Sequence, residues 1–238
     1  MAIVLINGGA RGIGRAMVEA FSKCGHYVAF TYKSSDEAAA ELSLATGALA
    51  IKADSSSEEE VIMAVNTVVE RLGSVNILIN NAAISSFSLF TDITLDEWNK
   101  TFSVNVNGAF LYSKAVLPAM IKEKQGRIIN ISSMWGITGS SCEVHYSATK
   151  AAIIGMTKAL AKEVGPSGIT VNCIAPGVID TDMNRALTEE DMAALSDETP
   201  LMRIGKPTEV ADAALFLASD KASFITGEVL NVNGGFLI

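Results

Sequence analysis

The stretch that decides the fold is IVLINGGARGIGRAM, residues 3–17, in which a short aliphatic run meets a glycine-rich turn and then a helix-like pattern. The apolar run of residues 2–6 is unbroken, which is typical of a strand buried on both faces of a sheet. The turn has the spacing Gly8-x-x-x-Gly12-x-Gly14. Glycines there permit close backbone approach, and free amides at a helix start favour a pyrophosphate. These residues therefore predict a strand, a phosphate-binding loop and a helix.

Similar aliphatic runs recur along the whole chain, at residues 27–31, 48–51, 77–79, 127–131, 169–174 and 229–232. Helix-period stretches separate most of them. Parallel strands need crossover connections, and helices of this length supply them. The pattern predicts an α/β fold: a single domain over residues 1–238, with a Rossmann-type, doubly wound parallel sheet of about seven strands flanked by helices on both faces.

Composition excludes several classes of protein. Of the 238 residues 49% are hydrophobic and 18% charged, which allows a large core. The net charge of -8 would repel a polyanion, and no run of Lys or Arg offsets it, so we expect no nucleic-acid partner. No apolar run approaches the roughly 20 residues of a membrane helix, so we expect no membrane partner and a cytoplasmic location. Three cysteines without C-x-x-C spacing, and only two histidines, predict no metal site.

The end of the second predicted strand indicates which dinucleotide the loop would take. In a Rossmann-type fold an acid there holds a ribose 2'-hydroxyl and repels a 2'-phosphate. This chain has no acid at that point; it has Tyr32 and the cationic Lys33, and Arg11 of the glycine loop can reach the same side of the ribose. These residues favour NADP(H). NAD(H) stays possible because Asp36 follows a few positions later.

A phenol and an ammonium four residues apart are the first candidate for chemistry. Tyr146 and Lys150, in YSATK, would share one face of a helix. A nearby positive charge lowers the pKa of a phenol, whose reference value of about 10 makes it a poor acid or base near neutrality. An exposed helical pair without function is the alternative interpretation of so short a motif.

Other motifs in the chain show that the Tyr146 and Lys150 pair belongs to a larger set of residues. The glycine loop, NNAA at residues 80–83, Asn105 and the serines at residues 132–133 accompany it in order. Together they resemble the short-chain dehydrogenase/reductase family over residues 3–235. Within that family the phrases NISS (130–133), APGVIDTDM (175–183) and ITGEVLNVNGG (225–235) are most similar to bacterial 3-oxoacyl-[acyl-carrier-protein] reductases.

The resemblance implies a role for each matching residue. Tyr146 would donate a proton to the substrate oxygen, Ser133 would hydrogen-bond that oxygen, and Lys150 would lower the Tyr146 pKa and hold the nicotinamide ribose. Asn105 would link Lys150 to a water chain. Ser133 is favoured over its neighbour Ser132 by spacing, since strand neighbours point to opposite faces. The implied cofactor-binding residues are Gly8, Arg11, Gly12, Ile13, Gly14, Tyr32, Lys33, Asp54, Asn81, Ala82, Tyr146, Lys150, Pro176, Gly177 and Thr181.

The implied activity is NADPH-dependent reduction of a 3-oxoacyl thioester carried by an acyl carrier protein, in fatty-acid synthesis. The substrate side would be formed by Ser133, Trp135, Glu143, Tyr146 and Met183. Several positions depart from the family pattern: Asn7 replaces Thr, Ala83 replaces Gly, and Glu143 replaces Gln. The resemblance also implies two basic residues that would bind an acidic acyl carrier protein. Lys124 occupies one of these positions, and Ser167 occupies the other.

Two other functions remain open. A sister reductase acting on a free ketone, sugar or steroid alcohol is one alternative, and a non-catalytic NADP(H)-sensing module is the other.

Two structural expectations also follow from the sequence pattern. The irregular stretch of residues 176–207 is either an apolar lid or a helix pair packed on the body. The helix from Tyr146 is apolar on several sides, so we expect a homo-oligomer, a tetramer by family resemblance, with a helix-to-helix contact.

Overall fold

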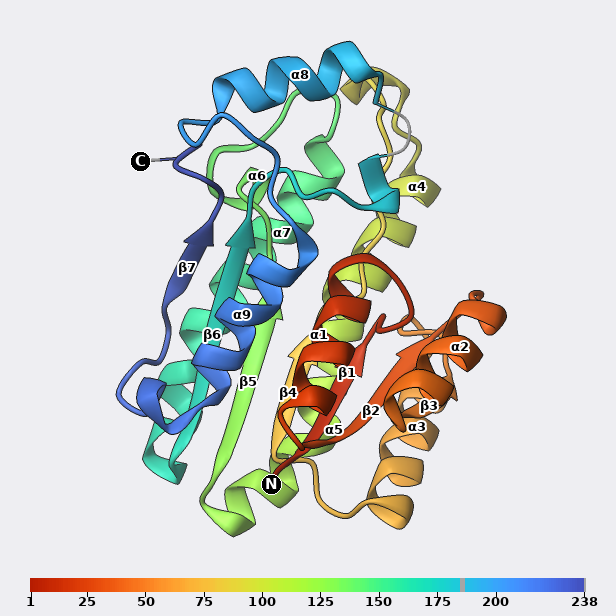
Figure 1. Ribbon diagram of the computed structural model, residues 1–238, viewed down its shortest axis with the longest axis vertical. Helices are drawn as coiled ribbons and strands as arrows, with labels where there is room; N and C mark the ends of the chain where they lie inside the picture. Colours follow the sequence, from red (N-terminus) through yellow and green to blue (C-terminus); the bar gives the residue numbers. More distant parts are fainter. Residues whose placement is uncertain (185–186, 238) are drawn as a thin grey trace.

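A seven-stranded sheet forms the centre of the computed structural model, which describes residues 1–184 and 187–237 (Figure 1). Every neighbouring pair of strands is parallel, in the order β3-β2-β1-β4-β5-β6-β7. The strands are β1 (Ile3–Asn7), β2 (Tyr27–Tyr32), β3 (Leu49–Lys52), β4 (Ile77–Asn80), β5 (Gly126–Ile131), β6 (Ile169–Pro176) and β7 (Val229–Val232). All seven aliphatic runs form strands, which confirms the predicted fold class.

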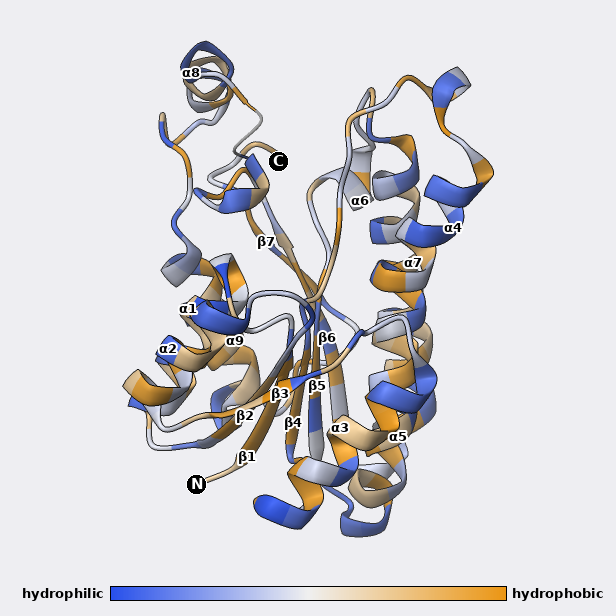
Figure 2. Cartoon of the chain, turned by 90° about the vertical axis from the view of Figure 1, so that its right-hand side faces the viewer, coloured by the Kyte–Doolittle hydropathy of each residue, from blue (hydrophilic) through white to orange (hydrophobic). Residues whose placement is uncertain are grey.

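Helices cover both faces of the sheet (Figure 2). One face carries α1 (Gly12–Lys23), α2 (Asp36–Thr46) and α9 (Pro207–Ala218). The other carries α3 (Glu58–Arg71), α5 (Gly108–Glu123) and α7 (Val144–Val164). Beyond the carboxyl ends of the strands lie α4 (Leu95–Phe102), α6 (Trp135–Thr138) and α8 (Glu189–Glu198) (Figure 1). Short turns complete the chain: η1 (Phe90–Asp92), η2 (Ser103–Asn107), η3 (Gly165–Ser167), η4 (Asp182–Asn184) and η5 (Asp220–Ala222).

The core is split by the sheet into two apolar layers. Successive residues of a strand point to opposite faces, so Ile6 packs with α1 and α9 while Leu5 packs with α3, α5 and α7. Both side chains are fully buried. Burying such a side chain contributes about 1.5–3 kcal/mol. Every residue of β4 and β6 is buried, including the polar residues Asn80, Thr170 and Asn172.

The strand order reverses between β1 and β4, and this point positions the site. From β1 the chain moves outward to β2 and β3, then returns to place β4 on the other side of β1. The loops that leave the carboxyl ends of β1 and β4 therefore go to opposite faces and leave a crevice, where ligands bind in open α/β sheets. The glycine loop follows β1, and the NNAA motif begins at the end of β4.

Within the described part of the segment predicted to be a lid or a helix pair, residues 176–184 and 187–207, one regular helix, α8, forms before α9 begins, and none of its residues is buried. Helix α8 lies across the top of the molecule, beyond the ends of the strands (Figure 1). Arg185 and Ala186, which belong to the predicted segment, lie outside the described residues. In residues 1–184 and 187–237 no helix is both long and apolar enough to cross a membrane.

Candidate active site

The start of helix α1 is open to an anionic ligand. Its N-cap residue, Arg11, makes no side-chain capping bond, and the first turn contains no acidic residue. The first amides of a helix have no partner inside the helix, and the helix dipole favours negative charge at this end. The end of α1 that follows the glycine loop therefore suits a phosphate group.

Glycines make the loop compact enough for this role. Gly8 and Gly12 have φ angles of +67° and +53°, which side chains rarely adopt. A Cβ atom on Gly14 would lie only 2.1 Å from the Gly8 carbonyl oxygen. A Cβ on Gly12 would lie 3.3 Å from the Thr181 methyl group, so the segment after β6 comes back to the glycine loop. The residues present thus fit the pyrophosphate of a dinucleotide.

Asn7 fixes the second loop of the crevice. Its Oδ1 accepts hydrogen bonds from the backbone amides of Asn81, at 2.7 Å, and Ala82, at 2.6 Å. In return the Asn81 side chain donates to the Gly8 carbonyl at 2.9 Å. The two loops are thereby tied together at the point where the resemblance places the nicotinamide side of the cofactor. The replacement of Thr by Asn at position 7 therefore retains a hydrogen-bonding side chain.

A ladder of buried asparagines continues from Asn7 across the sheet. Asn7 donates to Asn80 at 3.0 Å, Asn80 donates to Asn130 at 2.9 Å, and Asn130 donates to Thr157 of α7 at 2.9 Å. The three asparagines face one another in register on β1, β4 and β5. Because an unpaired buried amide is costly, this ladder fixes the register of the strands and links the cofactor loops to helix α7.

Two cations stand at the end of the crevice predicted to hold the adenosine ribose. Lys33, just after β2, lies 2.5 Å from an oxygen of Asp54, the predicted adenine-contacting acid. Arg11 lies 3.9 Å from Asp182. Asp36, the acid that kept NAD(H) open, starts α2 and pairs with Lys52 at 2.8 Å.

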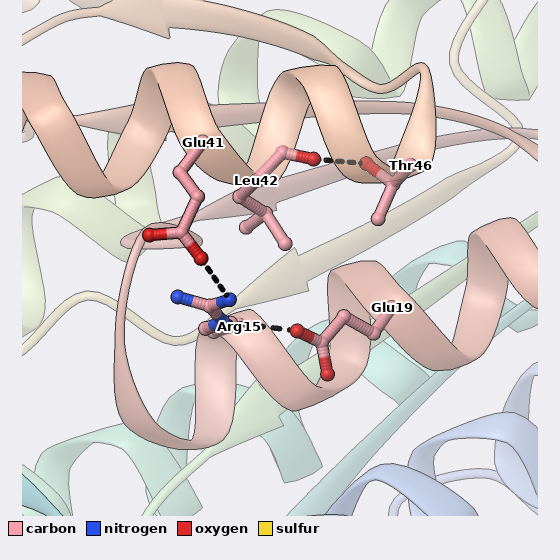
Figure 3. Close-up of polar contacts among 5 residues, drawn as sticks. All are labelled: Arg15, Glu19, Glu41, Leu42 and Thr46. Atoms are coloured by element: carbon pink, nitrogen blue, oxygen red, sulfur yellow. Dashed lines mark hydrogen bonds and ion pairs between the residues drawn. The ribbon is translucent and has the colours of Figure 1, made fainter.

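Arg15 is the other cation near the glycine loop, and acids hold it. Its guanidinium bonds Glu19 at 2.9 Å on α1 and Glu41 at 2.8 Å on α2 (Figure 3). These contacts raise the pKa of Arg15 above its ordinary value. Arg15 therefore joins two helices, whereas Arg11 and Lys33 lie beside Asp182 and Asp54 at the predicted ribose end of the crevice, where a 2'-phosphate would sit.

Tyr146 and Lys150 lie on one face of α7, as predicted, and both are buried. The Lys150 Nζ lies 5.5 Å from the centre of the Tyr146 ring. Burial raises the pKa of Tyr146 above its ordinary value, while a hydrogen bond with the Ser133 side chain acts in the opposite direction. The effect of Lys150 on this pKa, which the family resemblance implies, stays a prediction. The phenol is protonated at neutral pH.

The Lys150 ammonium is held without a carboxylate partner among the described residues. Its Nζ donates to the Ile131 carbonyl at 2.9 Å. Burial lowers the pKa of Lys150 to about 8, and the nearby Cys173 side chain opposes that shift. A cation with a pKa so close to neutrality can respond to a bound ligand.

The two neighbouring serines after β5 have separate tasks. Ser132 donates to the Lys150 carbonyl at 2.8 Å and so holds α7 against the end of the strand. Ser133 accepts from the Trp135 amide at 3.1 Å and contacts the Tyr146 phenol. Of the two serines, Ser133 is therefore the one beside the Tyr146 phenol.

Asn105 lies in η2, a π-helical turn between α4 and α5. Its side chain accepts from the Ile84 amide at 2.8 Å and donates to the Ile84 carbonyl at 2.9 Å and to Thr149 at 3.0 Å. Thr149 is the neighbour of Lys150 on α7. The protein thus brings Asn105 to the catalytic helix through Thr149. Turns of this kind are common at functional sites.

The residues predicted for the substrate side lie before and after Tyr146 in the chain. Glu143 is buried at the start of α7 and accepts a hydrogen bond from Ser85. Trp135 packs edge-on against Phe236 near the carboxyl terminus, with ring centres 5.7 Å apart. Met183, in η4, keeps about half of its side chain exposed, at 49%.

The remaining predicted cofactor residues line the same end of the sheet. Pro176 ends β6 and its carbonyl accepts from the Met134 amide at 2.9 Å. Gly177 follows, where a Cβ would lie 2.8 Å from the Asn233 Cα. Tyr32 ends β2, and Ile13 lies in the first turn of α1. The parallel sheet, with a dinucleotide loop at its switch point and a buried Ser, Tyr and Lys set, defines a nicotinamide-dependent oxidoreductase.

Comparisons with known proteins agree. A family model described as "Enoyl-(Acyl carrier protein) reductase" matches residues 8–237. The 3-oxoacyl-[acyl-carrier-protein] reductase FabG of Aquifex aeolicus is 42% identical, over 98% of this chain and 96% of its own. The protein of the same name from Vibrio harveyi is 41% identical, with 98% and 96% covered. An acetoacetyl-CoA reductase of Shinella zoogloeoides is 41% identical, with 98% and 97% covered. The chain belongs to the short-chain dehydrogenase/reductase family.

Some residues of the site were missed by sequence reasoning. Ser85 and Ser86 contact Glu143 and His145, and Phe236 covers Trp135. These partners lie 58 or more residues apart in the chain, so no local pattern joins them. Sequence analysis identified Asn7 only as a departure from the family pattern. Its position directly before the first glycine of the loop was the signal that its side chain could bind the neighbouring backbone.

Proposed function

We propose that this protein reduces the keto group of a 3-oxoacyl thioester, carried by an acyl carrier protein, to the 3-hydroxyacyl form in fatty-acid synthesis. The observation that carries the proposal is the buried set of Ser133, Tyr146 and Lys150 beside a dinucleotide loop. The names of the similar reductases support the thioester substrate.

The residues divide the work on the substrate oxygen between them. Ser133 and Tyr146 hydrogen-bond the keto oxygen and so orient it and stabilise the charge that develops there. Tyr146 then gives its phenolic proton to that oxygen, and its raised pKa keeps the proton in place until it is needed. The Lys150 ammonium stabilises the phenolate that remains. When bound, the nicotinamide supplies the hydride that completes the reduction.

We further propose that the cofactor is NADP(H). Lys33 and Arg11 are the two cations beside the adenosine end of the crevice, and Asp36 is paired with Lys52. A 2'-phosphate would find attraction there, while NAD(H) would lose that contact. Glycines at the pyrophosphate position serve both cofactors equally.

The assembly and setting of the protein are part of the same proposal. Residues 1–238 act as one domain, in the cytoplasm, as a homo-oligomer. Helix α7 supports the last point, because small residues at a spacing of four, Ala151, Gly155 and Ala159, are exposed along one side of it. Two such faces can approach closely.

Loss of reduced-nicotinamide absorbance tests the function. The substrates are acetoacetyl-acyl carrier protein, acetoacetyl-CoA and a simple ketone, each with NADPH and with NADH. The proposal expects the highest kcat/KM for the carrier-linked thioester with NADPH. A free ketone that turns over while both thioesters are inert would instead identify a reductase of another pathway, and cofactor binding without any turnover would favour a sensing module.

A further inference from the structure

Glu143 is an acidic side chain inside the wall of the site. It directly precedes α7, three residues before Tyr146, and only 7% of it is exposed. Its Oε1 accepts a hydrogen bond of 2.5 Å from the Ser85 hydroxyl, in the loop after β4. The carboxyl group is near enough to Tyr146 that its ionised form would raise the pKa of the phenol. The carboxyl group therefore lies close to the reacting oxygen.

The loop after β4 holds this carboxyl group in place through several contacts. Next to Ser85, the Ser86 hydroxyl hydrogen-bonds the Nε2 of the fully buried His145 at 2.8 Å. Two residues later, the Ser88 amide donates to the Cys142 carbonyl at 2.8 Å. Contacts on both sides of the Ser85–Glu143 bond leave the Glu143 side chain little freedom to swing toward water.

The groups around Glu143 offer it little compensation for a negative charge. On α7 the titratable neighbours are His145 and Tyr146; from α4, Glu97 faces His145. Among the described residues no Lys or Arg forms an ion pair with Glu143. A buried, unpaired carboxylate costs several kcal/mol, so the neutral acid is favoured. Consistently, burial raises the pKa of Glu143, and the Ser85 bond and His145 offset only part of that shift.

We propose that Glu143 is a specificity-determining residue that meets the substrate as an uncharged carboxylic acid and donates a hydrogen bond to a second carbonyl group. Oε1 accepts from Ser85, which leaves Oε2 to carry the proton, and Oε2 has no hydrogen-bond partner among the described residues. A donor this close to Tyr146 suits an acceptor a few atoms from the keto oxygen. In a 3-oxoacyl compound that acceptor is the thioester carbonyl, an identification that rests on the proposed function.

The pH dependence of catalysis in two variants and one control tests whether Glu143 is protonated. The pH dependence of kcat/KM for acetoacetyl-CoA is measured for wild type, Glu143→Gln, Ser85→Ala and the exposed-site control Glu123→Gln. Wild type and control should lose activity as the Glu143 proton leaves, in addition to the decline that Lys150 causes near pH 8. Glu143→Gln, which always carries a donor, should lack the first decline. Ser85→Ala should move it to higher pH, because the Ser85 bond favours the ionised form.

Removing the donor gives the size of the effect. Glu143→Ala should lower kcat/KM for acetoacetyl-CoA about tenfold at acidic pH, as expected for one hydrogen bond to a substrate. Identical pH profiles for wild type and Glu143→Gln, or an unchanged kcat/KM in Glu143→Ala, would overturn the proposal.

Carbon-13 NMR of glutamate-labelled protein separates this proposal from the proposed function. The carboxyl signal that disappears in Glu143→Gln should titrate at higher pH than the bulk of the glutamate carboxyl signals, because burial raises the pKa of Glu143. This holds whether or not a thioester is reduced. If that signal titrates together with the bulk of them, Glu143 is an ordinary carboxylate and the proposal fails, even if the thioester is a good substrate.

Discussion

Lys150 is a buried residue whose ammonium group lies next to the Tyr146 phenol. Only 3% of the residue is exposed, and burial lowers its pKa to about 8. The ordinary value for lysine is near 10.5, so the ammonium loses its proton at a lower pH than an exposed lysine would. The positive charge is present below pH 8 and lost above it.

This shift predicts a decline of kcat/KM as the pH rises through about 8, because the neutral amine no longer stabilises the Tyr146 phenolate. Steady-state kinetics across pH 6–10 measure it. The exposed neighbour provides the control: Lys158→Met should keep the decline. A wild-type profile that stays flat to pH 10 would show that the Lys150 charge does not matter.

Lys33 carries a prediction about the cofactor. Its ammonium lies beside Asp54 at the adenosine end of the crevice and is largely exposed. Lys33→Ala should lower kcat/KM for NADPH about tenfold, the loss of one charged contact, and change that for NADH by less than twofold. Lys23→Ala, at the far end of α1, is the matched control. Equal losses with both cofactors would argue against a 2'-phosphate contact.

At the residue scale the sequence was informative wherever the chemistry was local. Tyr146 and Lys150 are four residues apart on one helix, and the neighbouring Ser132 and Ser133 have different partners. Contacts between segments that are distant in the sequence could not be predicted. The Glu143 carboxyl meets Ser85 across 58 residues, and no periodicity predicts such a pair.

At the scale of elements, the asparagine ladder joins three strands to helix α7. Asn7→Ala removes the acceptor of two backbone amides and the donor to Asn80. Leaving these buried groups unpaired should lower the free energy of unfolding by about 2–3 kcal/mol and weaken dinucleotide binding. Urea unfolding and cofactor titration measure the two effects. The exposed Asn99→Ala on α4 should change stability by less than about 0.5 kcal/mol; an Asn7→Ala protein as stable as that control would contradict the role of the ladder.

The seven strands could be predicted because burial on both faces leaves short aliphatic runs, such as residues 3–6 in β1 and 77–79 in β4. The π-helical turn η2 could not. Its sequence, SVNVN, continues from α4 into α5 without a Gly or Pro inside it, and the extra residue of such a turn leaves no periodic mark. Yet this turn is what presents Asn105 to Ile84 and Thr149.

At the scale of the whole molecule, the exposed side of α7 predicts self-association. A Cβ on Gly155 would meet nothing within 4 Å in the single chain, so a larger side chain there disturbs only a partner. Gly155→Trp should therefore reduce the mass measured by sedimentation equilibrium without unfolding the protein. Leu44→Trp, at a 90% exposed position on α2, should leave the mass unchanged. A wild-type protein that sediments as a monomer would contradict the proposed oligomer.

The central claim is that Tyr146 gives the proton to the substrate oxygen, and one substitution tests it most directly. Tyr146→Phe keeps the ring that packs near Lys150 and removes only the hydroxyl. The account predicts that kcat for acetoacetyl-CoA falls about 10²–10⁴-fold, the range for loss of a general acid, while the Kd for NADPH measured by fluorescence stays within about twofold. A Tyr146→Phe protein that retains wild-type turnover would show that another group supplies the proton.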